Sequence, residues 1–104
     1  MIRSADGTRI EELVREKREE ILRIAEQHGA YNVRLFGSVA RGEAGPDSDV
    51  DLLIDVHDGQ TTPWFPGGLI AELEDLLGRR VDIVFADSIR PAFAPFILRD
   101  ARPL

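Results

Sequence analysis

The fold is decided by two neighbouring stretches, Leu35-Phe36-Gly37-Ser38-Val39-Ala40-Arg41-Gly42 and, after a turn-rich gap, Ser48-Asp49-Val50-Asp51-Leu52-Leu53-Ile54. The first is the end of a short apolar strand, followed by a glycine–serine turn and residues typical of one helical turn. The second places two carboxylates, one residue apart, at the head of another strand. A glycine turn beside paired carboxylates suits phosphate and metal chemistry, and the rest of the chain can be interpreted as its scaffold.

An amphipathic helix is predicted before the first strand. Thr8-Arg9-Ile10-Glu11 matches a capping box, so we expect one helix from there to about His28, stopped by Gly29, after a loose lead-in over residues 1–7. Its apolar stripe consists of Ile10, Leu13, Val14, Ile21, Ile24 and Ala25. Lys17 and His28 also fall in this stripe. Their simplest interpretation is a lysine stem lying over the core and a histidine placed against the helix dipole, rather than catalytic roles.

The later elements follow from periodicity and turn residues. The predicted strands and helices are strands at 31–36, 50–56 and 79–85, a helix at 69–77, and a last helix from Ser88 to about Asp100, interrupted by Pro91 and Pro95. A Gly/Pro-rich loop over 57–68 carries Trp64 and Phe65. These two aromatic side chains could stack on an adenine, contact a partner or anchor the loop to the core.

The phase of the strands brings three carboxylates together. If the alternate apolar residues of the second and third strands pack under the helices, then Asp49, Asp51 and Asp82 all emerge on the opposite face of the sheet. Three carboxylates on one face repel one another unless a cation lies among them. Mg²⁺ takes such oxygen ligands together with substrate phosphates, and two such ions can support an in-line displacement at phosphorus.

The glycine turn supplies the remaining part of this site. Gly37 lets the backbone approach a phosphate closely, and the Ser38 hydroxyl can donate a hydrogen bond to a phosphate oxygen. Arg41 could add a cation for a triphosphate. Each of these features alone is weak evidence, whereas their joint occurrence at this spacing favours a nucleotide and metal site.

Composition narrows the remaining choices. The 104 residues suffice for one domain, over 1–104, and for no second one. A net charge of −6 argues against a protein whose main ligand is the nucleic acid backbone, because that affinity comes from clustered Lys and Arg. There is no cysteine, hence no disulfide or thiolate metal site, and no apolar run approaches a membrane span. We therefore expect a cytoplasmic protein.

The central motif resembles that of a known superfamily. Gly37-Ser38, ten residues, and Asp49-Val50-Asp51 are similar to the signature of the DNA polymerase beta-type nucleotidyltransferases, and the residues around them resemble the minimal nucleotidyltransferase branch. The resemblance implies an α+β (mixed α/β) fold, a small mixed sheet flanked by helices, with Mg²⁺ and ATP bound at the carboxylates. By position, Asp49 and Asp51 match metal ligands. Asp82 matches a third metal ligand that can also accept the proton of the attacking hydroxyl, and Gly37 and Ser38 match the phosphate-binding turn.

The resemblance also implies a partner. Minimal nucleotidyltransferases are commonly encoded beside a small helical HEPN protein, a ribonuclease toxin, and act as antitoxins. Some members transfer AMP from ATP to a tyrosine of that toxin, so the resemblance implies a type VII-like antitoxin of this kind. Two alternatives remain open from the sequence. One is a non-catalytic binding module that neutralises a HEPN partner by direct contact, suggested by the apolar tail around Phe93, Phe96 and Ile97. The other is nucleotidyl transfer to a small molecule or an RNA end, against which the acidic balance and short chain count.

Overall fold

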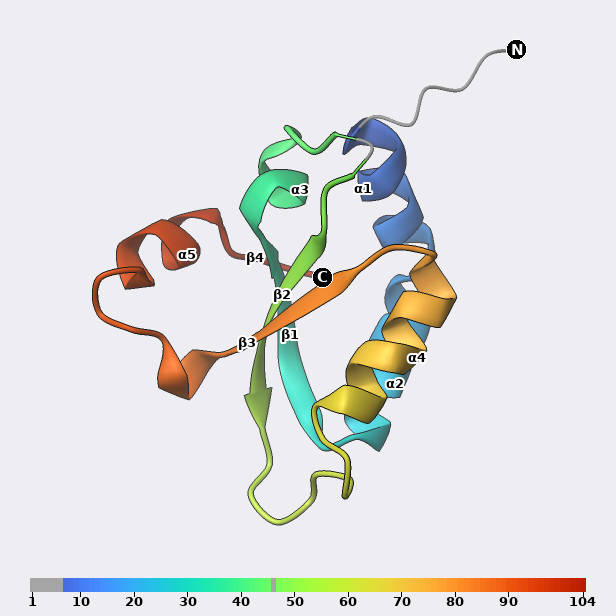
Figure 1. Cartoon of the computed structure of the whole chain (residues 1–104), viewed down its shortest axis with the longest axis vertical. Coiled ribbons are helices and arrows are strands. Elements are labelled where there is room, and N and C mark those ends of the chain that lie inside the picture. The colour runs from blue at the N-terminus through green and yellow to red at the C-terminus, as the bar shows by residue number, and fades with distance from the viewer. Residues whose placement is uncertain (1–6, 46) are drawn as a thin grey trace.

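The computed structural model describes residues 7–45 and 47–104. The elements in chain order are α1 (Gly7–Glu16), α2 (Arg18–Gln27), β1 (Ala30–Phe36), α3 (Gly37–Arg41), β2 (Val50–Val56), α4 (Gly67–Leu77), β3 (Val81–Phe85), the 3-10 turn η1 (Ala86–Ser88), α5 (Ala94–Asp100) and β4 (Arg102–Pro103). The strands form one mixed sheet in the order β3-β2-β1-β4, in which β2 is parallel to β3 and antiparallel to β1, and β1 is antiparallel to β4. The predicted α+β fold, a small mixed sheet flanked by helices, is confirmed (Figure 1).

Helices cover the sheet unequally on its two sides. α1, α2 and α4 lie on one side, where their apolar faces meet alternate residues of the strands, whereas α5 lies on the other (Figure 1). The fully buried large side chains are Val14, Ile21, Val39, Val50, Leu52, Leu53, Ile54, Leu69 and Leu73. β2 supplies four of them because it is a central strand with neighbours on both edges.

The aspartate-bearing face of the sheet is only partly open. By strand alternation Leu53 lies on the same face as Asp51, yet Leu53 is fully buried. Its burial follows from the C-terminal segment, in which η1 contacts β2 and α5 contacts β1. The open part of this face is therefore the end where β2 and β3 begin, which is also the end that carries Asp51 and Asp82.

The N-terminal helix differs from its prediction. It begins at Gly7, inside the predicted lead-in, and is divided into α1 and α2 at Lys17, whose ψ of 11° departs from the helical value. The Lys17 amide still donates to the Leu13 carbonyl and the Lys17 carbonyl still accepts from the Ile21 amide, so the break is a bend with the apolar stripe intact. Residues 1–6 and the Thr8 side chain of the predicted capping box lie outside the described part.

The C-terminal segment also differs. Pro95 does not interrupt a helix but occupies the first turn of α5, where its missing N–H costs nothing, and Ser88 ends the separate turn η1 rather than capping the helix. The two-residue strand β4 then adds to the edge of the sheet, with Leu35 opposite Arg102. It was not predicted, because two residues, one of them proline, show no strand periodicity.

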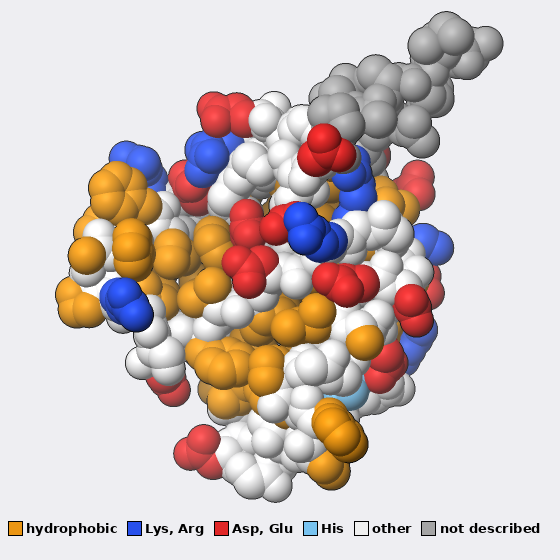
Figure 2. All heavy atoms as spheres, viewed as in Figure 1, with side chains coloured by type: hydrophobic (Ala, Val, Ile, Leu, Met, Phe, Trp, Pro, Cys, Tyr) orange, Lys and Arg blue, Asp and Glu red, His pale blue; other side chains and the backbone are white. Residues whose placement is uncertain are grey.

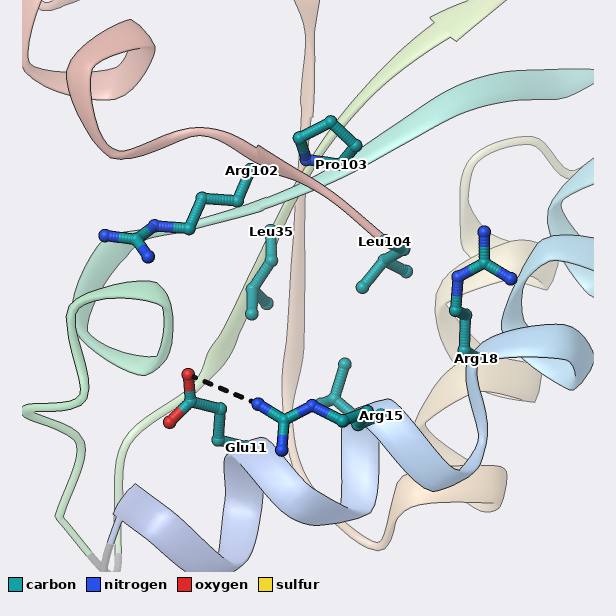
Figure 3. Close-up of a pocket in the computed structure, with 8 residues that line it drawn as sticks. Glu11, Arg15, Arg18, Leu35, Arg102, Pro103 and Leu104 are labelled. Atoms are coloured by element: carbon teal, nitrogen blue, oxygen red, sulfur yellow. Dashed lines mark ion pairs between the residues drawn. The ribbon is translucent and has the colours of Figure 1, made fainter.

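A hollow of about 210 Å³ lies where β4 meets α1 and α2 (Figure 3). Its apolar floor includes Leu35 and Leu104, and Arg15, Arg18 and Arg102 surround it. Leu35 belongs to the helix-covered side of the sheet, so this hollow is separate from the aspartate face. Within the described residues, no helix is long and apolar enough to cross a membrane.

Candidate active site

The parallel pairing of β2 with β3 places two of the predicted aspartates level with each other. Asp51 is the register partner of Asp82, and Val50 is the partner of Val81. The Val50 amide donates to the Arg80 carbonyl at 2.8 Å, which fixes the start of the two strands relative to each other. Because side chains at paired positions point to the same face, Asp51 and Asp82 emerge together, as the strand phase predicted.

Asp82 and Asp49 lie close enough to Asp51 for their negative charges to act on it. The pKa of Asp51 is raised to about 6, first by burial and then by repulsion from Asp82 and Asp49, while the positive charge of Arg41 opposes the shift. A carboxyl group half withdrawn from water beside two others holds its proton more tightly than a free one. The ionised carboxylates of the site therefore repel one another.

Gly37 lies directly against this group. A Cβ atom at Gly37 would lie 2.2 Å from Asp51 Oδ2, and its φ is +77°, a conformation that favours glycine. The sequence attributed this glycine to close approach of a phosphate. In the structure its absent side chain makes room for the Asp51 carboxylate, so the turn and the carboxylate are packed as one unit.

The short helix α3 starts at this turn. It begins at Gly37, and Val39 and Ala40 on its inner side are buried in the core. The Ser38 carbonyl accepts a hydrogen bond from the Glu43 amide at 2.9 Å, which closes the turn. Within residues 7–45 and 47–104 the Ser38 hydroxyl has no hydrogen-bond partner, so it is available to donate to a ligand.

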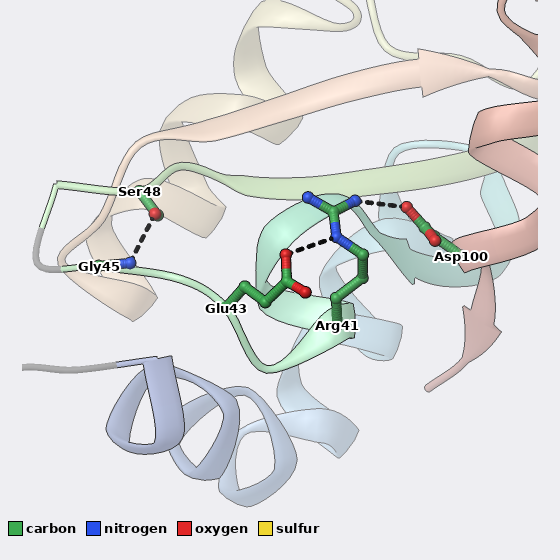
Figure 4. A network of polar contacts seen from close by, with 5 residues as sticks. All are labelled: Arg41, Glu43, Gly45, Ser48 and Asp100. Carbon is green, nitrogen blue, oxygen red and sulfur yellow. Dashed lines mark hydrogen bonds and ion pairs between the residues drawn. The ribbon is translucent and has the colours of Figure 1, made fainter.

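Arg41 is held by two carboxylates rather than left open toward the site. Its guanidinium donates to Glu43 Oε1 at 3.1 Å and to Asp100 Oδ2 at 2.5 Å, so that it links α3 to the end of α5 (Figure 4). The hydrogen bonds to Glu43 and then Asp100 raise the pKa of Arg41. The sequence named Arg41 but gave no signal for Asp100, which lies 59 residues further along the chain.

The loop before β2 is closed by a serine. The Gly45 amide donates to Ser48 Oγ at 2.8 Å (Figure 4). Asp49 then pairs with Arg80 across a Nε–Oδ1 distance of 3.6 Å. The two residues line a hollow of about 310 Å³ with Asp47, Ser48, Gly78 and Arg79.

The donor set suits a hard divalent cation, although the side chains do not enclose one as placed. In the part of the chain that the structure describes, no three His, Cys, Asp or Glu side chains form a group that could hold a metal ion. Asp49 pairs with Arg80 instead, across 3.6 Å. The chemistry nevertheless fits, because carboxylate oxygens are the ligands that Mg²⁺ prefers. The pKa of Asp51 is raised first by burial and then by repulsion from Asp82 and Asp49, and a cation would relieve this repulsion.

Two residues of the loop before α4 have different surroundings. Phe65 stacks on Phe85 with ring centroids 5.7 Å apart and packs against the core, which matches the anchoring interpretation. Trp64 is 83% exposed.

His28, at the end of α2, is buried, and its ring nitrogens form hydrogen bonds with Thr62 at 2.7 Å and Glu72 at 2.6 Å. The sequence did not indicate this network.

Comparison with known proteins places this geometry in a family. The model of the nucleotidyltransferase domain matches residues 14–104. The protein adenylyltransferase MntA of Thermococcus cleftensis is 40% identical over 77 residues, which are 74% of this chain and 77% of that protein. A solved structure described as a candidate minimal nucleotidyltransferase is 47% identical, with a TM-score of 0.79 over 90% of this chain and 95% of that one. A toxin–antitoxin complex crystallised with AMP-PNP shares the fold, with a TM-score of 0.68 at 20% identity over 82% of this chain and 69% of that one.

Proposed function

This chain belongs to the nucleotidyltransferase domain family, and we propose that it is a Mg²⁺-dependent protein adenylyltransferase that acts as an antitoxin. The main observation behind this proposal is that Asp51 lies level with Asp82 on the neighbouring strand and directly against Gly37 of the Gly37–Ser38 turn. The Thermococcus relative, named a protein adenylyltransferase, supports AMP as the transferred group and a protein as the acceptor. The same fold also occurs in a toxin–antitoxin complex crystallised with AMP-PNP.

The proposed reaction is displacement at the α-phosphorus of ATP. A hydroxyl oxygen of the acceptor forms the new bond to phosphorus, the bond to the pyrophosphate oxygen breaks, and AMP remains on the acceptor. Asp82 accepts the hydroxyl proton, and the Gly37–Ser38 turn holds phosphate oxygens through its amides and the Ser38 hydroxyl. Mg²⁺ held by Asp49, Asp51 and Asp82 would neutralise the charge that develops on the phosphates.

The acceptor that we propose is a tyrosine of a HEPN ribonuclease toxin. The physical account of inhibition is direct, because a tyrosine that carries AMP adds bulk and negative charge where RNA phosphates have to bind. The acidic character of the chain, with a net charge of −6, fits a protein acceptor better than an RNA acceptor.

Transfer can be tested with the protein encoded beside this chain. Wild-type protein with Mg²⁺ and α-labelled ATP should label the neighbouring protein on tyrosine and reduce its ribonuclease activity. Asp49→Asn combined with Asp51→Asn should abolish labelling while the fold, checked by circular dichroism, is retained. Absence of labelling by folded wild-type protein, with the partner present and intact, would contradict the proposed transfer.

The same double variant decides between transfer and contact. The observation that favours neutralisation by contact alone is the set of exposed apolar side chains on and before α5. If the folded double variant still inhibits the ribonuclease completely at equal concentration, contact suffices and the transferase site is not needed. We expect the variant to lose inhibition.

The metal requirement has its own test, which does not depend on the acceptor. Isothermal titration of Mg²⁺ or Mn²⁺ in the presence of a non-hydrolysable ATP analogue should show binding to wild type that is weakened in Asp82→Asn. Asp75→Asn, a substitution of an exposed aspartate on α4, serves as the control. Equal metal binding by Asp82→Asn and wild type would remove Asp82 from the metal site.

A further inference from the structure

Large apolar side chains stand exposed on one lobe of the molecule, formed by α5 and the turn before it. Phe93, Phe96 and Leu98 are 54%, 59% and 54% exposed, and we call them the α5 ridge. Figure 2 shows hydrophobic side chains gathered on this lobe, which projects from the sheet at the side away from α1, α2 and α4 in Figure 1. A contiguous exposed apolar surface of this kind is typical of an interaction site.

The helix α5 is not explained by its own packing. None of its residues is buried, and its first turn is fixed by Pro95. It directs Phe96 and Leu98 outward, although placing both in water forgoes the burial that normally stabilises a short helix. A partner that covers the ridge would supply this missing burial.

Charge indicates the kind of partner. Two arginines border the ridge, Arg90 before α5 and Arg99 within it, and the Arg99 guanidinium lies 5.6 Å from the centre of the Phe96 ring. In the described part of the chain neither arginine is paired with a carboxylate, although the chain as a whole has a net charge of −6. The ridge therefore suits a surface that is apolar at its centre and acidic at its border.

The ridge is physically connected to the candidate active site. Asp100, the last residue of α5, holds Arg41 at the end of α3, and α3 begins at Gly37, which lies directly against Asp51. In Figure 2 acidic side chains lie at the centre of the same view, with hydrophobic side chains between them and the lobe. A protein that covers the ridge would thus lie beside the reacting carboxylates.

We propose that the α5 ridge is the docking surface for the protein acceptor, which meets it with an apolar patch bordered by Asp or Glu. The inference rests on the proposed function. It assigns recognition of the acceptor to the exposed apolar side chains on and before α5. Docking there would orient the acceptor hydroxyl toward Asp51 and Asp82.

The test compares variants of the ridge with a matched aromatic elsewhere. Phe93→Ser combined with Phe96→Ser should raise KM for the acceptor protein, and its Kd measured without nucleotide, by about tenfold or more, as for central aromatic residues of interfaces. Binding of the ATP analogue should be unchanged. Trp64→Ser, which removes an aromatic side chain that is still more exposed, should leave both values within about twofold, since isolated surface substitutions are usually small in effect.

A charge variant tests the acidic border. Arg90→Glu combined with Arg99→Glu should slow association with the acceptor and weaken its salt dependence, while Arg23→Glu on the exposed surface of α2 should not. Docking at the ridge is overturned if the Phe93/Phe96 variant binds the acceptor as well as wild type does, if it loses the ATP analogue by the same factor, or if it changes only self-association of this chain. If wild type binds the acceptor through the ridge but transfers nothing, only the proposed transfer fails.

Discussion

The carboxylate of Asp51 occupies the space that a side chain at position 37 would fill. A Cβ atom on Gly37 would lie 2.2 Å from Asp51 Oδ2, well inside van der Waals contact. Gly37 therefore has two structural roles. It permits the left-handed backbone that starts α3, and it lets the Asp51 carboxylate approach the turn. Turn and carboxylate depend on each other, which makes position 37 the sharpest probe of the site.

Gly37→Ala should lower both stability and activity. The left-handed backbone costs an L-residue about 1–2 kcal/mol, and the new methyl group must also displace Asp51. Gly59→Ala is the matched control, because Gly59 has the same φ of +77° and nothing within 4 Å of its Cβ position. We expect both variants to unfold at lower urea concentration and only Gly37→Ala to lose nucleotidyl transfer. Retention of full activity by Gly37→Ala would show that Asp51 does not need its observed position.

Arg41 and Asp100 give a prediction that separates substrate binding from structure. If Arg41 leaves its ion pairs to bind the triphosphate, Arg41→Ala should raise KM for ATP by about tenfold, the usual range for loss of a charge-assisted hydrogen bond. Asp100→Asn removes one competing carboxylate and should leave KM for ATP unchanged or lower it. Steady-state kinetics at varied ATP concentration measure both. Equal loss in the two variants would instead make the ion pair a purely structural link between α3 and α5.

Regular periodicity explains what could be predicted from the sequence. The bounds of β2 were predicted without error, and Asp82 was placed beside Asp51 although 30 intervening residues separate them, because alternation with period two fixes the face of each strand residue. The turn at Gly37 was predicted from a different local signal, an isolated glycine directly after an apolar strand.

Contacts between distant segments explain what could not be predicted. The pair Arg41–Asp100 joins residues that no local pattern relates, and burial of Leu53 depends on how the C-terminal segment folds back over the sheet. The bend at Lys17 keeps the helical hydrogen bonds on both sides, so the apolar stripe showed no interruption there. Tertiary packing, not propensity, decided each of these features.

The buried histidine should contribute to stability but not to catalysis. His28 joins the end of α2 to the loop at Thr62 and to Glu72 of α4, on the helix side of the sheet. His28→Ala leaves the Thr62 hydroxyl and Glu72 without this partner and should reduce the free energy of unfolding by about 1–3 kcal/mol. His57→Ala, which removes an exposed ring stacked on Tyr31, should change it by less than about 1 kcal/mol. Urea unfolding gives the free energies, and a large loss of activity in folded His28→Ala would assign this network a role in the site.

Replacement of Asp51 should stabilise the metal-free protein while it abolishes transfer. The pKa of this carboxyl is about 6 in the folded chain against an ordinary value of 3.8, so the fold favours the protonated form. The stability that this preference gives the folded chain is fully present below pH 3.8 and is lost as pH rises through 6. Asp51→Asn carries no proton to lose, and we therefore expect it to be more stable than wild type at pH 7.5 in EDTA, with the difference shrinking as pH falls toward 4. Urea unfolding at both pH values, with Asp75→Asn as the exposed control, measures this difference. Addition of Mg²⁺ with an ATP analogue at pH 7.5 should increase the free energy of unfolding of wild type and not that of Asp51→Asn. The reason is that the positive charge of the bound Mg²⁺ offsets the repulsion among the three carboxylates. If Asp51→Asn is the less stable protein at pH 7.5 in EDTA, the Asp51 carboxylate is stabilised in the fold by contacts that outweigh its burial and its repulsion from Asp82 and Asp49.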